Sequence, residues 1–222
     1  MPRKRVGVIG SGPAGQRLAS AFSSLGYETK IGSRDPEKLK DYIAQSGGRI
    51  TAGTFDQTAT FGDIIVLSTH GEATESAIEL AHPMNFAHKL VIDTSNPLDF
   101  SKGMPPGIPT NYSTKTLGEH VQEKLGDAKV VKCFNTVPNE VMFRPKFEDT
   151  NMLICGNDSD AKKEVTQILK EFGWAGSIDL GGIDNAKWLE ALVPLWVRAA
   201  LATGNYSSMF KFVQSAEPST RR

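Results

Sequence analysis

The chain has 222 residues, which is enough for one sizeable hydrophobic core or for one domain with a small appendage. Its 25 Lys and Arg residues balance its 25 Asp and Glu residues, and the resulting net charge of zero argues against a protein that binds nucleic acid through a basic field. The two cysteines have no metal-ligand spacing and predict no metal site, and no apolar run approaches the roughly 18 residues of a membrane span, so we expect a cytoplasmic protein.

The N-terminal half alternates short apolar strands with helical segments. Pro13 suits the first turn of a helix and Gly26 its end, and Asp35 is the expected N-cap of another helix that begins at Pro36. Apolar strands that alternate with helices are typical of a parallel sheet covered on both faces. We predict strands at 5–9, 27–31, 50–52, 63–69 and 89–95, and helices at 13–25, 36–46 and 72–82.

A long loop separates these elements from the second half of the chain. Residues 96–115 are rich in Pro, Gly, Ser and Thr, and a loop of this length is typical of a binding segment. The elements predicted after it are strands at 128–134, 151–156 and 175–181 and helices at 116–126, 159–173 and 184–204, the last interrupted at Pro194. The predicted fold class is therefore α/β, a Rossmann-type doubly wound, mostly parallel sheet with a smaller C-terminal α+β portion.

A glycine-rich turn, GSGPAG, joins the first predicted strand to the first predicted helix. Gly10, Gly12 and Gly15 match the pattern G-x-G-x-x-G in the strand–turn–helix context that a dinucleotide-binding turn requires. Gly10 permits the tight turn, Gly12 lets a pyrophosphate approach the backbone, and Gly15 lets the helix pack close to the strand. The start of the helix then offers N–H groups and a partial positive charge to the phosphates.

The end of the second predicted strand lacks an acidic residue. NAD-binding folds place an acid there to hold the ribose 2′-hydroxyl, but this chain has Gly32 followed by Ser33 and Arg34. We interpret Gly32 as making room for a 2′-phosphate, Ser33 as a hydroxyl donor and Arg34 as a planar donor suited to phosphate, with Lys38 as a second cation. The pattern predicts NADP(H) selectivity; the alternative is that Arg34 is a surface residue paired with a nearby acid.

Several motifs together resemble a known family. GSRDPEK (32–38), SNPL (95–98), VVKCFNT (130–136), and ICGND followed by AKKEV (154–165) are similar to the NADP oxidoreductases that use the deazaflavin coenzyme F420. The cytosolic NADPH domain of the STEAP metalloreductases belongs to the same group. The resemblance covers nearly the whole chain, and it implies an NADPH-dependent reductase.

The resemblance also implies a role for individual positions. The turn residues Ser11, Pro13 and Ala14 would touch the pyrophosphate, together with the three glycines, and Ser33, Arg34 and Lys38 would take the 2′-phosphate. Further along the chain, the implied contacts with the ribose, the diphosphate and the nicotinamide ring come from Thr69, His70, Asn96, Pro97, Cys133, Phe134 and Asn135. The apolar helix around Trp188, Leu195 and Trp196 would wall the acceptor site.

These observations lead to a set of expectations about organisation and function. We expect a NADP(H)-binding domain over 1–138, a smaller C-terminal portion over 139–213 that carries the acceptor site and a homodimer contact, and a disordered tail over 214–222. Hydride transfer between NADPH and coenzyme F420 or a flavin needs positioning rather than an acid or base, so we expect no catalytic side chain, and His70 is the one candidate that the sequence offers. The alternatives are a hydroxyacid or imine dehydrogenase, for which Lys187 is followed by Glu190 instead of the usual Asn, and a non-enzymatic NADP(H)-binding sensor.

Overall fold

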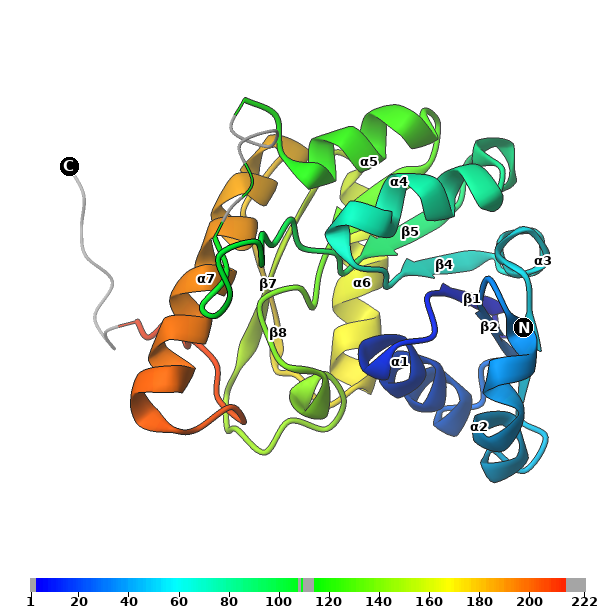
Figure 1. The fold of residues 1–222 in the computed structure, drawn as a ribbon, viewed down its shortest axis with the longest axis horizontal. Coiled ribbons are helices and arrows are strands. Elements are labelled where there is room, and N and C mark those ends of the chain that lie inside the picture. The colour runs from blue at the N-terminus through cyan, green and yellow to red at the C-terminus, as the bar shows by residue number, and fades with distance from the viewer. Residues whose placement is uncertain (1–2, 108, 110–113, 215–222) are drawn as a thin grey trace.

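A single sheet of eight strands forms the centre of the protein in the computed structural model, which describes residues 3–107, 109 and 114–214 (Figure 1). The strand order is β3-β2-β1-β4-β5-β6-β7-β8, and every neighbouring pair is parallel except β6 and β7. The strands are β1 (Val6–Ile9), β2 (Thr29–Gly32), β3 (Ile50–Gly53), β4 (Ile64–Leu67), β5 (Leu90–Asp93), β6 (Lys129–Lys132), β7 (Asn151–Gly156) and β8 (Gly176–Asp179).

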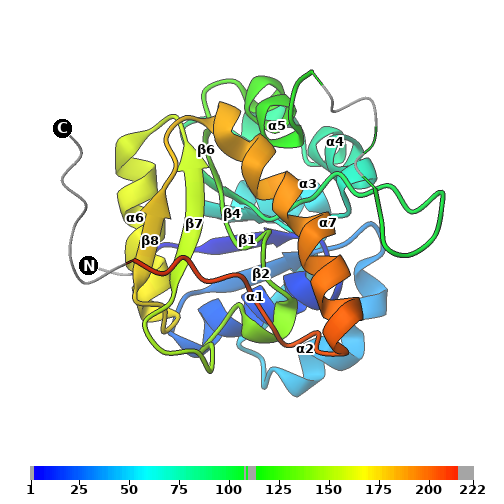
Figure 2. The ribbon, with the colours of Figure 1, turned by 90° about the vertical axis from the view of Figure 1, so that its left-hand side faces the viewer.

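Helices cover both faces of this sheet, as Figures 1 and 2 show from two directions. One buried cluster packs α1 (Pro13–Ser24), α2 (Lys40–Gln45) and α6 (Ser159–Glu171) against the sheet. The cluster on the opposite face involves α3 (Phe55–Phe61), α4 (Gly71–Leu80), α5 (Leu117–Leu125) and α7 (Ala186–Thr203). The central strands β1, β4 and β5 are buried on both sides, which explains their continuous Val and Ile runs. The strand order and the helices on both faces confirm the predicted doubly wound, mostly parallel fold.

The C-terminal elements extend the same sheet. β7 pairs antiparallel with β6, and β8 pairs parallel with β7, so the sheet continues across the boundary expected near residue 138. That domain boundary stays a prediction. Most of the tail predicted over 214–222 lies outside the described residues, which end at residue 214.

Two helical segments differ from the prediction. The sequence analysis missed α3, whose start is fixed because Thr54 and Gln57 form a capping box in which each side chain bonds the other residue's backbone N–H. The helix expected from Pro36 is a 3₁₀ turn (Pro36–Leu39) followed by the short α2. Asp35 occupies the predicted N-cap position before this turn, but its side chain makes no capping hydrogen bond with the described residues.

The last helix, α7, runs without interruption through Pro194, contrary to the predicted break. Pro194 and its neighbour Val193 are buried, so packing on this side holds the helix together despite the missing backbone N–H. Within the part of the chain that the structure describes, no helix combines the length and the apolar character needed to cross a bilayer.

Candidate functional site

A cleft of about 590 Å³ opens along the carboxyl ends of the strands, where the strand order reverses between β1 and β4. Open α/β sheets bind their ligands at this switch point, and the volume falls within the range of small-molecule sites. Of the residues expected to bind the cofactor, those that line the cleft are Gly10, Ser11, Gly12, Pro13, Ala14, Ser33, Arg34, Lys38, Thr69, His70, Asn96, Phe134 and Asn135.

The glycine-rich turn between β1 and α1 is shaped by three different constraints. Gly10 has a φ of +116°, and a Cβ there would lie 2.0 Å from the Ser68 carbonyl oxygen. A Cβ on Gly15 would lie 2.0 Å from the Gly10 carbonyl oxygen, so Gly15 is required for the helix to approach the strand. Gly12, in contrast, has an ordinary φ of −72°, and its Cβ would meet no atom within 4 Å. Packing within the chain therefore explains Gly10 and Gly15 but not Gly12, which borders open space in the cleft.

A polar corner of the cleft lies at the end of β2. The Ser33 hydroxyl accepts a hydrogen bond from the backbone N–H of Asp35 at 3.2 Å and lies 3.3 Å from the Ser11 hydroxyl, so it is held beside the glycine-rich turn. Arg34 is exposed and forms no ion pair with any described residue, which removes the alternative that it is paired with a nearby acid. The Lys38 ammonium lies 3.7 Å from the Asp35 carboxylate. The corner thus contains two cations, Arg34 and Lys38, and the Ser33 hydroxyl. The Asp35 carboxylate next to Lys38 partly offsets the positive charge.

Gly32 serves a different purpose from the one expected. A Cβ on Gly32 would lie 2.8 Å from Thr58 Oγ1 and 3.1 Å from the ring of Phe55, because α3 packs directly against this end of β2. The missing side chain accommodates α3 and does not leave room for a phosphate. The side chain of an acid at this position would collide with α3.

Two asparagines form the wall at the other end of the cleft. The Asn96 side chain donates from Nδ2 to the Asn135 carbonyl oxygen at 2.8 Å, and Asn135 Nδ2 donates to Asn96 Oδ1 at 2.9 Å. These two bonds fix the orientation of both amides, since turning either one would place oxygen against oxygen or NH₂ against NH₂. We call these residues the Asn96–Asn135 pair. Asn135 Oδ1 is buried and has no hydrogen-bond partner among the described residues.

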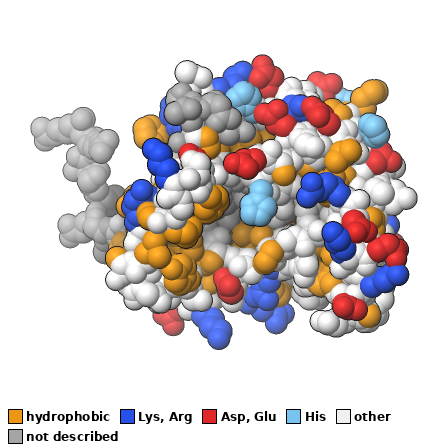
Figure 3. All heavy atoms as spheres, in the orientation of Figure 1, with side chains coloured by type: hydrophobic (Ala, Val, Ile, Leu, Met, Phe, Trp, Pro, Cys, Tyr) orange, Lys and Arg blue, Asp and Glu red, His pale blue; other side chains and the backbone are white. Residues whose placement is uncertain are grey.

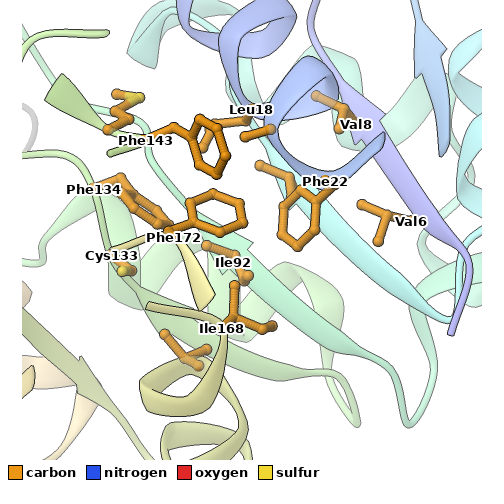
Figure 4. Close-up of a cluster of buried hydrophobic side chains, with 14 of the residues drawn as sticks. Val6, Val8, Leu18, Phe22, Ile92, Cys133, Phe134, Phe143, Ile168 and Phe172 are labelled. Carbon is orange, nitrogen blue, oxygen red and sulfur yellow. The ribbon is translucent and has the colours of Figure 1, made fainter. Parts of the chain in front are cut away.

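Some expected residues lie away from the cleft. Gly15 and Pro97 are buried beside it, and Cys133 points into the core on the α6 side, close to Phe134 and Phe172 (Figure 4). Burial raises the pKa of the Cys133 thiol well above its ordinary value. The helix residues expected around the acceptor, Trp188, Leu195 and Trp196, do not line the cleft.

His70 lies beyond the end of β4, which is shorter than the strand predicted over 63–69. β4 ends at Leu67, and His70 is the exposed N-cap residue of α4. Its side chain makes no capping bond, and it lines the cleft next to Thr69. No group of three or more His, Cys, Asp or Glu residues arranged to hold a metal ion occurs among the described residues.

The sequence analysis missed a buried group of charged side chains behind the asparagine wall. Lys132 Nζ lies 2.9 Å from Asp93 Oδ2 and 2.9 Å from Glu190 Oε1, and Asp93 and Lys132 are fully buried. We call these three residues the buried ion network. Burial alone would lower the pKa of Lys132, but the two carboxylates outweigh it and raise that pKa. The only signal in the sequence was a charged residue inside each of two apolar strand runs, LVIDTS and VVKCF.

A family model, a solved structure and a curated relative all point to the coenzyme F420-dependent NADP oxidoreductases. Residues 5–97 match the family model described as NADP oxidoreductase, coenzyme F420-dependent. A solved structure from Arthrobacter sp. FB24, a candidate F420-dependent NADP reductase, is 34% identical with a TM-score of 0.90 and aligns over 96% of this chain and 100% of that one. The F420-dependent NADP reductase of Methanocaldococcus jannaschii is 29% identical over 75% of this chain and 79% of its own length.

A second group of relatives is much longer. Metalloreductase STEAP2 of Mus musculus is 25% identical over 94% of this chain, but the match covers only 41% of the relative. The chain thus spans about two fifths of the length of this metalloreductase.

Proposed function

Because the chain belongs to the family of coenzyme F420-dependent NADP oxidoreductases, we propose that it transfers a hydride between NADP(H) and the deazaflavin coenzyme F420 or a flavin. The observation that carries the proposal is the open space beside Gly12, next to a corner with Ser33 and two cations. No packing among the residues that the structure describes accounts for the glycine, whereas a pyrophosphate on the backbone N–H groups does.

The residues of the cleft suit NADP(H) along its length. We place the pyrophosphate on the turn formed by Ser11 to Ala14, at the start of α1, and the 2′-phosphate against Ser33, Arg34 and Lys38. The other nucleotide then extends past Thr69 and His70 over the ends of β4 to β6, toward the Asn96–Asn135 pair. Bound NADPH supplies the hydride, and the chain's contribution is to bind and orient it.

The acceptor site follows from this placement. Beyond Asn135 the cleft is lined by Val137, Asn139 and Met142, from the segment that connects β6 to β7. A mostly apolar wall of this kind suits a flat ring system, so we assign the acceptor to this end of the cleft. The C-terminal helix, which the sequence analysis expected there, contributes no residue to the cleft.

We also propose that the outer face of α7 contacts a second copy of the chain. Trp188 and Leu195 on this helix are 63% and 53% exposed, and Phe212, on the segment that follows it, is 65% exposed. Hydrophobic side chains gather on the side of the molecule that α7 occupies (Figure 3). Exposed apolar surface of this extent commonly marks a protein interface. Sedimentation equilibrium tests this: Leu195→Glu should convert a wild-type dimer to a monomer, and a monomeric wild type contradicts the proposal.

The dehydrogenase alternative is less well supported. It requires Lys187 to reach a substrate, but Lys187 is exposed, lies with its ammonium 5.3 Å from the Trp188 ring centre, and does not line the cleft. One turn later, Glu190 is committed to the buried ion network. Neither side chain is placed to polarise a carbonyl or imine in the cleft.

A turnover assay tests the proposed function. Purified protein is mixed with NADPH and, in separate reactions, with coenzyme F420, FMN, FAD and ferric citrate, and NADPH oxidation is followed by its absorbance. We expect turnover with F420 or with a flavin. Tight NADPH binding without turnover of any acceptor would overturn the enzymatic proposal and favour an NADP(H)-binding sensor.

A further inference from the structure

The buried ion network joins four elements of the fold at one point. Asp93 ends β5, Lys132 ends β6, and Glu190 lies on α7. Glu190 Oε1 also accepts a hydrogen bond from the backbone N–H of Gly118 at 2.9 Å, and Oε2 accepts one from Leu117 at 3.2 Å. These N–H groups form the first turn of α5, so this carboxylate also satisfies donors that the helix cannot satisfy itself.

The same network reaches the asparagine wall of the cleft. Asp93 Oδ1 accepts hydrogen bonds from the backbone N–H and the hydroxyl of Ser95, at 2.9 and 2.6 Å. Ser95 immediately precedes Asn96, so this carboxylate sets the path of the chain into the wall. Lys132 lies at the end of β6, shortly before Asn135, and its ammonium donates to Asp93 Oδ2 at 2.9 Å. The two strand ends that carry the Asn96–Asn135 pair are thus joined through one ammonium group.

Stability alone is a weak explanation for this arrangement. Burying ionised groups is costly, and replacing a buried ion pair with well-packed neutral side chains often leaves stability unchanged or raises it. A role in positioning is different, because the three side chains add side-chain bonds among β5, β6 and α7 beyond the backbone pairing of the two strands, and neutral apolar groups of similar volume would not form them. Misplacement of a binding wall by about 1 Å is enough to slow a reaction by up to about 100-fold.

We propose that Asp93, Lys132 and Glu190 are positioning residues, which hold the Asn96–Asn135 pair in place for the nicotinamide end of bound NADP(H). This inference rests on the proposed function for the identity of the ligand. The geometry of the pair itself is independent of any ligand or acceptor, so it is measured separately from turnover.

The test uses the triple variant Asp93→Asn/Lys132→Met/Glu190→Gln, which removes all three charges together. Its control is Val165→Ala, a fully buried substitution on α6 outside the network that is expected to lower stability by creating a small cavity. The first readout is the NMR signal and solvent-exchange protection of the Asn96 and Asn135 side-chain NH₂ groups, without ligand. The second is the Kd for NADP⁺ and, separately, for adenosine 2′,5′-bisphosphate, whose two phosphates reach the polar corner and the glycine-rich turn but which has no group at the Asn96–Asn135 pair.

In the triple variant we expect both NH₂ groups to lose protection by about tenfold or more, and NADP⁺ affinity to fall about tenfold while adenosine 2′,5′-bisphosphate affinity is unchanged. The control should keep wild-type values in both readouts. If the triple variant does not fold, Glu190→Gln alone carries the same measurements. Protected NH₂ groups and an unchanged ratio of the two affinities would overturn the proposal, whereas failure of wild-type turnover would count only against the proposed function.

Discussion

The substitution Gly12→Ala separates ligand binding from folding at a single position. The backbone at Gly12 has a φ of −72° and a ψ of 179°, which Ala adopts without strain, and the new Cβ would contact no atom within 4 Å. Gly→Ala at such a position reduces the entropy of the unfolded chain and typically stabilises by about 0.4–1 kcal/mol. Gly12 is also the N-cap residue of α1, where Gly is favoured over Ala, and this offsets the gain, so we expect the ligand-free variant to have about the stability of wild type.

The effect on binding should have the opposite sign. The added methyl group would occupy the space in which we place the pyrophosphate, and it would push that group off the backbone N–H donors. One charge-assisted hydrogen bond contributes about 1.5–3 kcal/mol, so losing one weakens binding by about 10- to 100-fold.

The assay combines calorimetric titration with NADPH and thermal unfolding of the ligand-free protein. Gly107→Ala is a matched control, because a Cβ on Gly107 would also meet no atom within 4 Å and Gly107 does not line the cleft. Wild-type NADPH affinity in Gly12→Ala would refute the placement of the pyrophosphate. Loss of affinity together with a large loss of stability would refute the claim that packing does not require this glycine.

Three other substitutions test separate parts of the reasoning. Arg34→Ala should weaken NADPH binding by about 10- to 100-fold and leave NADH binding little changed; an equal loss for both would contradict a 2′-phosphate contact. Gly32→Asp should lower the free energy of unfolding by about 1–3 kcal/mol without creating tight NADH binding, because α3 fills the space that an acid needs; thermal unfolding and titration with NADH check this. Burial raises the pKa of Cys155 to about 12 from 9.0, so the thiol loses its proton more readily in the unfolded chain, and the free energy of unfolding should decline from pH 9 to pH 12. Urea unfolding measured over this pH range should show a shallower decline for Cys155→Ala than for wild type. Identical pH profiles for the two proteins would contradict this prediction.

The glycine-rich turn and the strands were predictable because their signals are local. Gly10, Gly12 and Gly15 follow a strand and open a helix, and each has a steric or ligand-binding reason that depends on nearby residues. The Val and Ile runs of the parallel strands show burial on both faces directly. The polar corner was also visible, since Ser33, Arg34 and Lys38 are close in the sequence.

Features that depend on tertiary contacts were not predictable in the same way. α3 is seven residues long and has no clear apolar period, so its only signal was the Thr54–Gln57 capping box. The reason for Gly32 lies in its contact with α3, which sequence spacing does not reveal.

The buried ion network was not predictable either, because its members come from distant parts of the sequence. Asp93 and Lys132 were recognisable as charges in apolar runs, but their shared partner, Glu190, comes from a distant helix. Cys133 was expected beside the nicotinamide ring, but its side chain lies in the buried cluster on the α6 side of the sheet. Neighbouring residues in an extended backbone point to opposite faces, so Cys133 and Lys132 lie on opposite sides of the sheet.

The change of direction between β6 and β7 bears on how this architecture diversifies. The antiparallel pairing there joins only two residue pairs, Val131 with Gly156 and Lys132 with Cys155, whereas the neighbouring parallel pairs β4–β5 and β5–β6 each join four. The segment that crosses this junction also lines the end of the cleft to which we assign the acceptor. Insertions or substitutions in this segment would therefore change the proposed acceptor end of the cleft and leave the strand pairing of the nucleotide-binding half unchanged. Related proteins can thus keep one cofactor site while the acceptor of the hydride differs.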